Sequence, residues 1–236
     1  MQPLLLLMAF LLPPGLGQPF LSEEIIGGHE AKPHSRPYMA LLQFLGEKSW
    51  KRCGGVLTQK DFVVTAAHCR GSSMSVTLGA HNIKQQERTQ QVIQVRRAIR
   101  HPDYNPKTFS NDIMLLQLER KAKQRSAVKP LSLPRAKARV ALGAPATSLQ
   151  EAELMVQEDQ VCETLYPRHC SQATQICVWD PRKVKTGFKG DAGGPLVCKK
   201  VVHGTFSYGK MNGIPPGVFT QVSHFLPWIK RTMKHL

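Results

Sequence analysis

The chain has 236 residues, and its 32 lysine and arginine residues outnumber its 16 aspartate and glutamate residues, giving a formal net charge of +16 at pH 7. The length is ample for one domain with a sizeable core. No segment approaches the roughly 18 uninterrupted apolar residues of a membrane-spanning helix, which excludes that class. The charge favours polyanionic partners, and without a zinc-finger pattern or aromatic platform, glycosaminoglycan is a more natural partner than nucleic acid.

The N-terminus is predicted to be a secretory signal at residues 1–17. Met1–Leu12 is almost wholly apolar, and Pro13–Gly17 supplies small and helix-breaking residues. No lysine or arginine precedes the apolar run, so the basic start of such a signal is weak. An uncleaved N-terminal anchor is the alternative. In a secreted chain, six cysteines indicate a disulfide framework.

Short apolar runs bounded by turns dominate the chain, which predicts β structure. The turn-rich segment His101–Pro106 separates two of these runs in the first half. The strands predicted there are Tyr38–Leu45, Gly55–Thr58, Phe62–Thr65, Ser75–Leu78, Gln91–Val95 and Ile113–Leu118.

The second half continues the same pattern after a basic, proline-bounded linker at residues 120–139. Its predicted strands are Ile176–Val178, Pro195–Cys198, Thr205–Tyr208 and Gly217–Val222. Only the C-terminal end is predicted to be helical, because its apolar residues fall on one face. That face carries Phe225, Trp228, Ile229, Thr232, Met233 and Leu236, and Lys230, Arg231 and Lys234 lie off it.

Three short segments carry the functional signal. Thr65–Cys69 reads Thr-Ala-Ala-His-Cys, Asn111–Leu116 begins with Asn-Asp, and Gly190–Pro195 reads Gly-Asp-Ala-Gly-Gly-Pro. These resemble the histidine, aspartate and serine segments of the chymotrypsin-like serine protease family, in that family's chain order. From Ile25 to about Val140, and again from Leu149 onward, the chain resembles the granzyme and cathepsin G group.

The resemblance implies an all-β fold of two six-stranded antiparallel β-barrels with a C-terminal helix, in a peptidase domain at residues 25–236. It also implies two disulfides, Cys53–Cys69 and Cys162–Cys177. The family's Cys-Ser-Val-Ala-Gly-Trp-Gly type of strand has no counterpart at residues 141–148. The second barrel is therefore predicted to lack its first strand.

The missing strand affects the remaining cysteines. Cys198 would lose its usual partner and Cys170 would be left over, although a Cys170–Cys198 bridge is conceivable. Loss of a native disulfide costs about 2–5 kcal/mol. Loss of an interior strand also exposes the edges of its neighbours, which invites aggregation.

Carried over by position, the resemblance makes His68 the general base and Asp112 the group that orients its imidazole. Position 192 would hold the nucleophilic serine, but the sequence has alanine there. Ala192 has no proton for His68 to remove and no lone pair to attack a carbonyl, so acylation is predicted to fail. The N–H groups of Gly190 and Ala192 would form an oxyanion hole. A natural inactive homologue and a variant engineered to hold substrate both remain open origins.

A second implied feature is activation by cleavage after Glu24. Residues 18–24 would form an activation peptide ending in an acidic dipeptide, which calls for a dipeptidyl peptidase or a similar enzyme. The new α-ammonium group of Ile25 would pair with the buried carboxylate of Asp191. Removing residues 1–24, which hold two of the acidic residues and none of the basic ones, raises the formal net charge to +18.

The resemblance also places a substrate pocket. Thr186 would form a neutral floor, so large apolar or aromatic side chains are predicted in preference to lysine or arginine. Lys189 at the rim would tolerate an acidic side chain. The other implied pocket residues are Gly187 and Gly217 at its sides and Ser207, Tyr208 and Gly209 at the edge that pairs with substrate.

Three functions remain open from the sequence. The first is a monomeric serine endopeptidase homologue, secreted and stored in leukocyte granules, that binds peptide or protein substrates or inhibitors but is inactive. The second is a non-catalytic cationic protein, binding heparin-like glycosaminoglycan or acting as an antimicrobial, through basic clusters at residues 96–97, 120–125, 135–139 and 230–234. The third is an unstable product without a function. No cofactor or metal is expected, because no His-Glu-x-x-His or paired Cys-x-x-Cys motif occurs.

Overall fold

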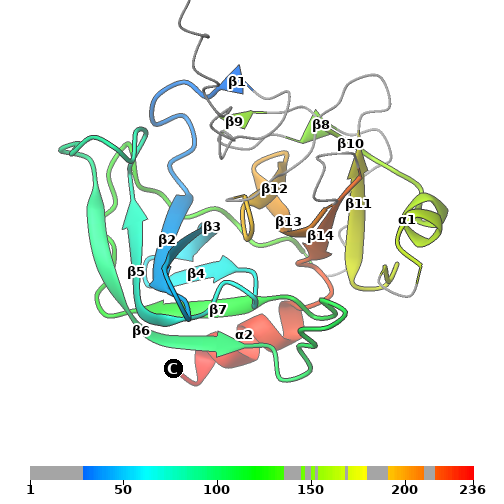
Figure 1. Ribbon diagram of the computed structural model, residues 1–236. Helices are drawn as coiled ribbons and strands as arrows, with labels where there is room; N and C mark the ends of the chain where they lie inside the picture. Colours follow the sequence, from blue (N-terminus) through cyan, green and yellow to red (C-terminus); the bar gives the residue numbers. More distant parts are fainter. Residues whose placement is uncertain are drawn as a thin grey trace, which may run out of the picture.

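The computed structural model describes residues 29–135, 145–146, 150–151, 154–167, 170–179, 191–209 and 216–236. They form two β-rich halves, with a C-terminal helix packed beneath the first half (Figure 1). The first half is a closed barrel with the strand order β2-β3-β4-β7-β6-β5. These strands are β2 (Met39–Leu45), β3 (Trp50–Gln59), β4 (Phe62–Thr65), β5 (Ser72–Leu78), β6 (Gln91–Arg100) and β7 (Met114–Leu118).

The alternation of side chains explains the barrel. In β2 the side chains of Ala40, Leu42 and Phe44 are buried, while the residues between them are only half-buried. They join Leu57 and Val76 in one apolar cluster inside the barrel. Because every strand of a closed barrel has two hydrogen-bonded neighbours, no backbone edge is left open.

The second half is a six-stranded sheet with the order β12-β13-β14-β11-β10-β8. Its end strands β8 and β12 approach within 8 Å at their Cα atoms but do not pair in the described residues. The predicted second barrel is thus a sheet that curls without closing. Its strands are β8 (Pro145–Ala146), β10 (Leu154–Val156), β11 (Gln175–Trp179), β12 (Pro195–Cys198), β13 (Val201–Tyr208) and β14 (Gly217–Gln221), and a separate pair joins β1 (His29–Glu30) to β9 (Gln150–Glu151).

β8 lies in the region where the first strand of the second barrel was predicted to be missing. Only Pro145 and Ala146 pair with β10 there, and residues 141–144 and 147–148 lie outside the described part. Proline has no N–H to donate, so Pro145 limits the ladder on this edge. Among the described residues, this edge of the sheet ends in a strand of two residues.

The two halves meet through an apolar cluster separate from the barrel interior. The first half contributes side chains of β3, β4 and β7, and the second contributes side chains of β12 and β13. Full burial of each such side chain stabilises the fold by roughly 1.5–3 kcal/mol, so the cluster fixes one half against the other. Its buried members are Val56, Val64, Ile113, Leu115, Leu131, Val197, Val202, Val222, Phe225 and Ile229.

The C-terminal helix α2 (Leu226–Lys234) confirms the predicted helix. Leu226 and Ile229 are buried, but Leu236, predicted on the apolar face, is 39% exposed because the helix ends before it. A second helix, α1 (Asp159–Leu165), shows that the prediction of helix at the C-terminal end alone was wrong. Its seven residues are too few for a helical period to be visible in the sequence. In the described residues, neither helix has the length and hydrophobicity needed to cross a bilayer.

The cysteine pairing follows the resemblance. Cys53 is bonded to Cys69 and Cys162 to Cys177. Cys198, at the end of β12, keeps a thiol, and no disulfide joins it to Cys170. Each predicted strand overlaps an observed one, with the largest extension in β3, which runs from Trp50 to Gln59.

A half-buried histidine couples the C-terminal segment to the first half. The ring of His101 contacts the rings of Phe225 and Trp228, with centroids 5.1 and 5.0 Å away. The His101 Nδ1 atom accepts a hydrogen bond from the Asp103 N–H at 3.3 Å. Burial lowers the pKa of His101, the nearby His224 lowers it further, and the negative charge of Asp103 opposes the shift. The imidazole is therefore held neutral.

We predict that His101→Gln makes stability less dependent on pH between about pH 7 and 5. The folded-state pKa of His101 is lower than its unfolded value, so the unfolded chain binds more protons in this window. Stability is full above the unfolded pKa of about 6.5 and falls as pH drops through it. Urea unfolding across this range measures the slope. The exposed His235→Gln should leave it unchanged, and an unaltered slope in His101→Gln contradicts the prediction.

Candidate active site

His68 lies in the loop that follows β4. The two residues before it, Ala66 and Ala67, are buried, and Cys69 after it is bonded to Cys53 in β3. The imidazole itself is 25% exposed. The loop is thus anchored on both sides of a histidine that remains accessible.

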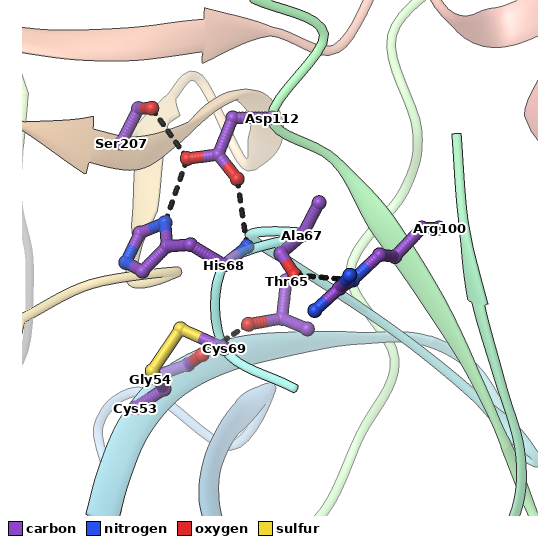
Figure 2. Close-up of a disulfide and its surroundings, with 9 residues drawn as sticks. All are labelled: Cys53, Gly54, Thr65, Ala67, His68, Cys69, Arg100, Asp112 and Ser207. Carbon is purple, nitrogen blue, oxygen red and sulfur yellow. Dashed lines mark hydrogen bonds and ion pairs between the residues drawn. A yellow bond between two sulfur atoms is a disulfide. The ribbon is translucent and has the colours of Figure 1, made fainter. Parts of the chain in front are cut away.

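Asp112 lies two residues before the start of β7 and is completely buried. Figure 2 shows its carboxylate between His68 and Ser207. The Oδ2 atom accepts a hydrogen bond from His68 Nδ1 at 2.8 Å and one from Ser207 Oγ at 2.5 Å, and Oδ1 accepts the His68 backbone N–H at 3.0 Å. Three donors replace the water that the buried carboxylate has lost.

The second half of the molecule supplies two of the groups around Asp112. The register of β13 against β14 shifts between Phe206 and Tyr208, and Ser207 lies at this irregularity. Such irregularities redirect side chains, and the Ser207 hydroxyl reaches the carboxylate. On β14, the Thr220 hydroxyl donates to the Asp112 backbone carbonyl at 3.0 Å. The site therefore lies where the two halves meet.

Asp112 sets the chemistry of His68. A carboxylate only accepts hydrogen bonds, so the proton of the neutral imidazole is assigned to Nδ1 and the lone pair to Nε2. Such an imidazole takes a proton from a neighbouring hydroxyl, and the carboxylate stabilises the imidazolium that forms. The hydrogen bonds to Asp112 fix the orientation of the imidazole, and this geometry is the one that a general base needs.

The loop Asp191–Gly194 docks against β3 beside this pair. The Gly54 N–H donates to the Ala192 carbonyl at 2.7 Å, and the Gly193 N–H donates to the Phe206 carbonyl at 2.8 Å. The Ala192 side chain packs against the barrel cluster that contains both cysteines of the Cys53–Cys69 bridge. His68, Asp112 and Ala192 are thus brought into one region.

Gly193 permits this close approach. Its φ is +76°, a conformation that L side chains rarely adopt. A Cβ atom here would overlap Thr65 Oγ1 and the Gly54 carbonyl oxygen. Those two atoms are hydrogen-bonded to each other at 2.7 Å, so neither is free to move aside.

Aromatic rings line the side of the site next to His68. The Phe109 ring contacts the His68 ring edge-to-face at 5.5 Å between centroids, and Tyr208 lies 5.8 Å from Phe109. Tyr166 contacts Tyr208 at 5.4 Å and donates its hydroxyl to the Pro216 carbonyl at 2.7 Å. Burial raises the pKa of Tyr208, so it stays a neutral phenol. Sequence reasoning named Tyr208 but missed Phe109 and Tyr166, because contact across loops leaves no local pattern.

Several predicted site residues lie outside the described part. They are Ile25, Thr186, Gly187, Lys189 and Gly190. Of the others, Gly209 directly follows β13 and Gly217 opens β14. The Asp191 carbonyl accepts the Gly194 N–H at 2.8 Å, which closes the turn around Ala192.

One group of side chains in the described residues has the spacing of a metal site. Ligand atoms of Cys53, His68 and Cys69 lie within 4.8 Å of one another. Both sulfur atoms belong to the disulfide, so neither offers the thiolate that a metal would need.

A family model described as Trypsin matches residues 25–229. The chain belongs to this family of serine proteases. Human Granzyme H is 65% identical, with all of both chains covered, and human Cathepsin G is 52% identical, covering 99% of this chain and 95% of its own. A solved structure described as "Structure of GrC" is 49% identical, with a TM-score of 0.85, and covers 89% of this chain and all of its own. The fold is trypsin-like, and the chain has a serine-protease scaffold of the granzyme and cathepsin G kind.

We predict that Gly193→Ala lowers the free energy of unfolding by about 2 kcal/mol or more. The new methyl group must displace the loop from β3 and break the hydrogen bond between Gly54 and Ala192. Urea denaturation measures the change. Gly46→Ala is the matched control, because there the methyl group meets the movable end of the Lys51 side chain. Equal stabilities of the two variants contradict the prediction.

Proposed function

We propose that this chain is a granzyme-like serine-protease homologue that binds extended segments of protein substrates or inhibitors without cleaving them. The observation that carries the proposal is the buried Asp112 carboxylate, bonded to both His68 and Ser207, beside a loop with alanine at position 192. Family membership supports peptides and proteins as the partner class. The general base is in place, and the group that it would activate is a methyl.

Acyl transfer needs an oxygen at position 192. In a working site, the imidazole removes the serine proton while the oxygen attacks the scissile carbonyl, and the same imidazole later protonates the leaving amine. Ala192 offers neither the proton nor the attacking lone pair. Where the catalytic groups act as a unit, loss of the nucleophile lowers turnover by roughly 10⁶-fold. Positioning and backbone donors alone leave a residual effect of about 10³–10⁴-fold over water.

The pocket proposed for this homologue accepts large apolar or aromatic side chains. A neutral floor at Thr186, with Gly187 and Lys189 nearby, supports this preference. The strand residues Ser207 and Tyr208 would pair with the backbone of a bound segment. We further propose that cleavage after Glu24 by a dipeptidyl peptidase frees Ile25 to pair with Asp191, which orders the loop around Ala192.

We propose that the protein is secreted, stored in leukocyte granules and monomeric. The apolar N-terminus and the two disulfides support an oxidising compartment. The similarity to Granzyme H and Cathepsin G supports the granule. The alignment with Granzyme H spans 250 residues, more than the 236 of this chain, so that relative carries residues that this chain lacks. This supports the proposal that a segment is missing from this chain.

We predict that Ala192→Ser creates hydrolysis of peptides with Phe or Tyr before the scissile bond, with a gain of up to roughly 10⁶-fold. The new hydroxyl would lie beside a general base that is already oriented. Initial rates with chromogenic peptides, measured on protein processed to begin at Ile25, test this. A fluorophosphonate probe should label residue 192 in the variant alone.

The control for this experiment is Asp112→Asn in the Ala192→Ser background. An amide in place of the carboxylate favours the wrong imidazole tautomer and should lower turnover by about 10⁴-fold. Circular dichroism confirms that each variant is folded. Labelling or rapid turnover in the unchanged chain refutes the proposal. A folded but inert Ala192→Ser variant shows that Ala192 is not the sole defect.

A basic cavity supports a second candidate function, the binding of a heparin-like glycosaminoglycan. The cavity has a volume of about 440 Å³ and lies between β6 and the segment after β7. Gln91 joins its walls, donating to the Lys123 carbonyl at 2.7 Å and accepting the Lys123 N–H at 2.8 Å. A sulfated chain would meet the lining cations Arg88, Arg120, Lys123 and Arg125.

We predict that Lys123→Ala with Arg125→Ala lowers the salt concentration that elutes the protein from heparin. Both side chains line the cavity, and their charges are screened by salt. The matched control, Lys230→Ala with Lys234→Ala, removes the same charge from α2. An equal shift in both pairs shows that binding follows net charge and not this cavity.

A further inference from the structure

The hairpin of β2 and β3 carries two exposed apolar residues at its tip. The side chain of Trp50 is 62% exposed and that of Leu45 is 38% exposed. The two residues are directly paired across the strands, so their side chains stand on the same face. The candidate site does not explain this pair, because the site loop contacts the middle of β3, at Gly54, and not the hairpin tip.

The tip is held rigidly. The Gly46 N–H donates to the Ser49 carbonyl at 2.9 Å, which closes the turn over Glu47 and Lys48. On its other side, β2 pairs with β5, with Leu45 opposite Ser72. The backbone that carries the apolar pair is therefore hydrogen-bonded on both sides, so binding would need little rearrangement of the backbone.

Cations surround the apolar pair. Lys48 lies in the turn, and Lys51 and Arg52 follow Trp50; all three are exposed. Arg70 is exposed too, and its neighbour Gly71 approaches Leu45 so closely that a Cβ there would overlap the Leu45 carbonyl oxygen. The only acid between Leu45 and Arg52 is Glu47. We call Leu45–Arg52 with Arg70 the hairpin tip.

We propose that the hairpin tip docks on an anionic lipid surface. Trp50 and Leu45 would enter the region between headgroups and acyl chains, where an indole satisfies both its apolar ring and its N–H. Lys48, Lys51 and Arg52 would lie among the headgroups and pair with anionic lipids. A soluble polyanion would contact the cations but leave the Trp50 indole in water. An anionic bilayer would contact the cations and also bury the indole. Two signals, one apolar and one basic, are what stable peripheral binding requires.

Docking in this way would place the candidate site close to the bilayer. Trp50 and Gly54 are four residues apart on one strand, which spans about 13 Å. The Gly54 N–H donates a hydrogen bond to the Ala192 carbonyl. The strand β3 therefore connects the site loop to the hairpin tip. The inference does not depend on whether the protein cleaves peptides.

Binding to phosphatidylcholine vesicles, with and without phosphatidylserine, tests the proposal. We expect binding to the anionic vesicles with a shift of tryptophan emission to shorter wavelength, and neither effect with pure phosphatidylcholine. Trp50→Ala should weaken binding by about tenfold and abolish the shift. Ile83→Ala, which removes another exposed apolar side chain, should change neither. Because Trp50 is exposed, its removal should leave the thermal unfolding temperature unaltered.

Three results would overturn the proposal. Equal vesicle binding by Trp50→Ala and the unchanged protein would mean that net charge alone drives binding. Weaker heparin retention in Trp50→Ala would assign the hairpin tip to a soluble polyanion. A dimer in sedimentation that Trp50→Ala dissolves, without vesicle binding, would assign it to a second copy of the chain.

Discussion

The buried carboxylate of Asp112 is the constraint on which the rest of the arrangement depends. A charge without solvent must be matched by donors, and the three that match it come from His68 and from Ser207. Ser207 belongs to the other half of the molecule. The two halves must therefore be correctly packed together before the Asp112 carboxylate has all of its hydrogen-bond donors. The apolar cluster between the halves fixes this packing. The chain thus has a buried, fully hydrogen-bonded carboxylate beside a histidine, next to a loop with alanine at position 192.

The two halves differ in whether their edge strands are left with unpaired backbone groups. The first closes completely, and its barrel carries His68, Asp112 and the disulfide that anchors the histidine loop. In the part of the chain that the structure describes, the second half does not close between β8 and β12, and it carries Ala192 in the turn before β12. The general base therefore rests on the more constrained half. The loop at position 192 depends on its hydrogen bonds to Gly54 and Phe206 for its placement.

Local patterns in the sequence were sufficient for ten strands and the C-terminal helix, but they missed the short strands β1, β8, β9 and β10. His68 and Asp112 were singled out by resemblance to a family, and the structure joins them by a hydrogen bond. Features that arise from distant parts of the chain were not predictable. Ser207 was placed at the pocket edge, but its bond to Asp112 spans 95 residues and depends on an irregularity in β13. Phe109 contacts His68 from a loop, and α1 is too short for a period. The pocket floor at Thr186 remains a prediction.

The incomplete second sheet has a consequence for how copies of the molecule behave together. In the described residues, β12 has a hydrogen-bonded neighbour strand, β13, on one side only. Unpaired backbone groups of this kind recruit strands from other molecules. Lys199 and Lys200, both exposed in the turn after β12, put like charges beside that edge. Colloidal stability then rests on repulsion between copies, which concentrated salt screens.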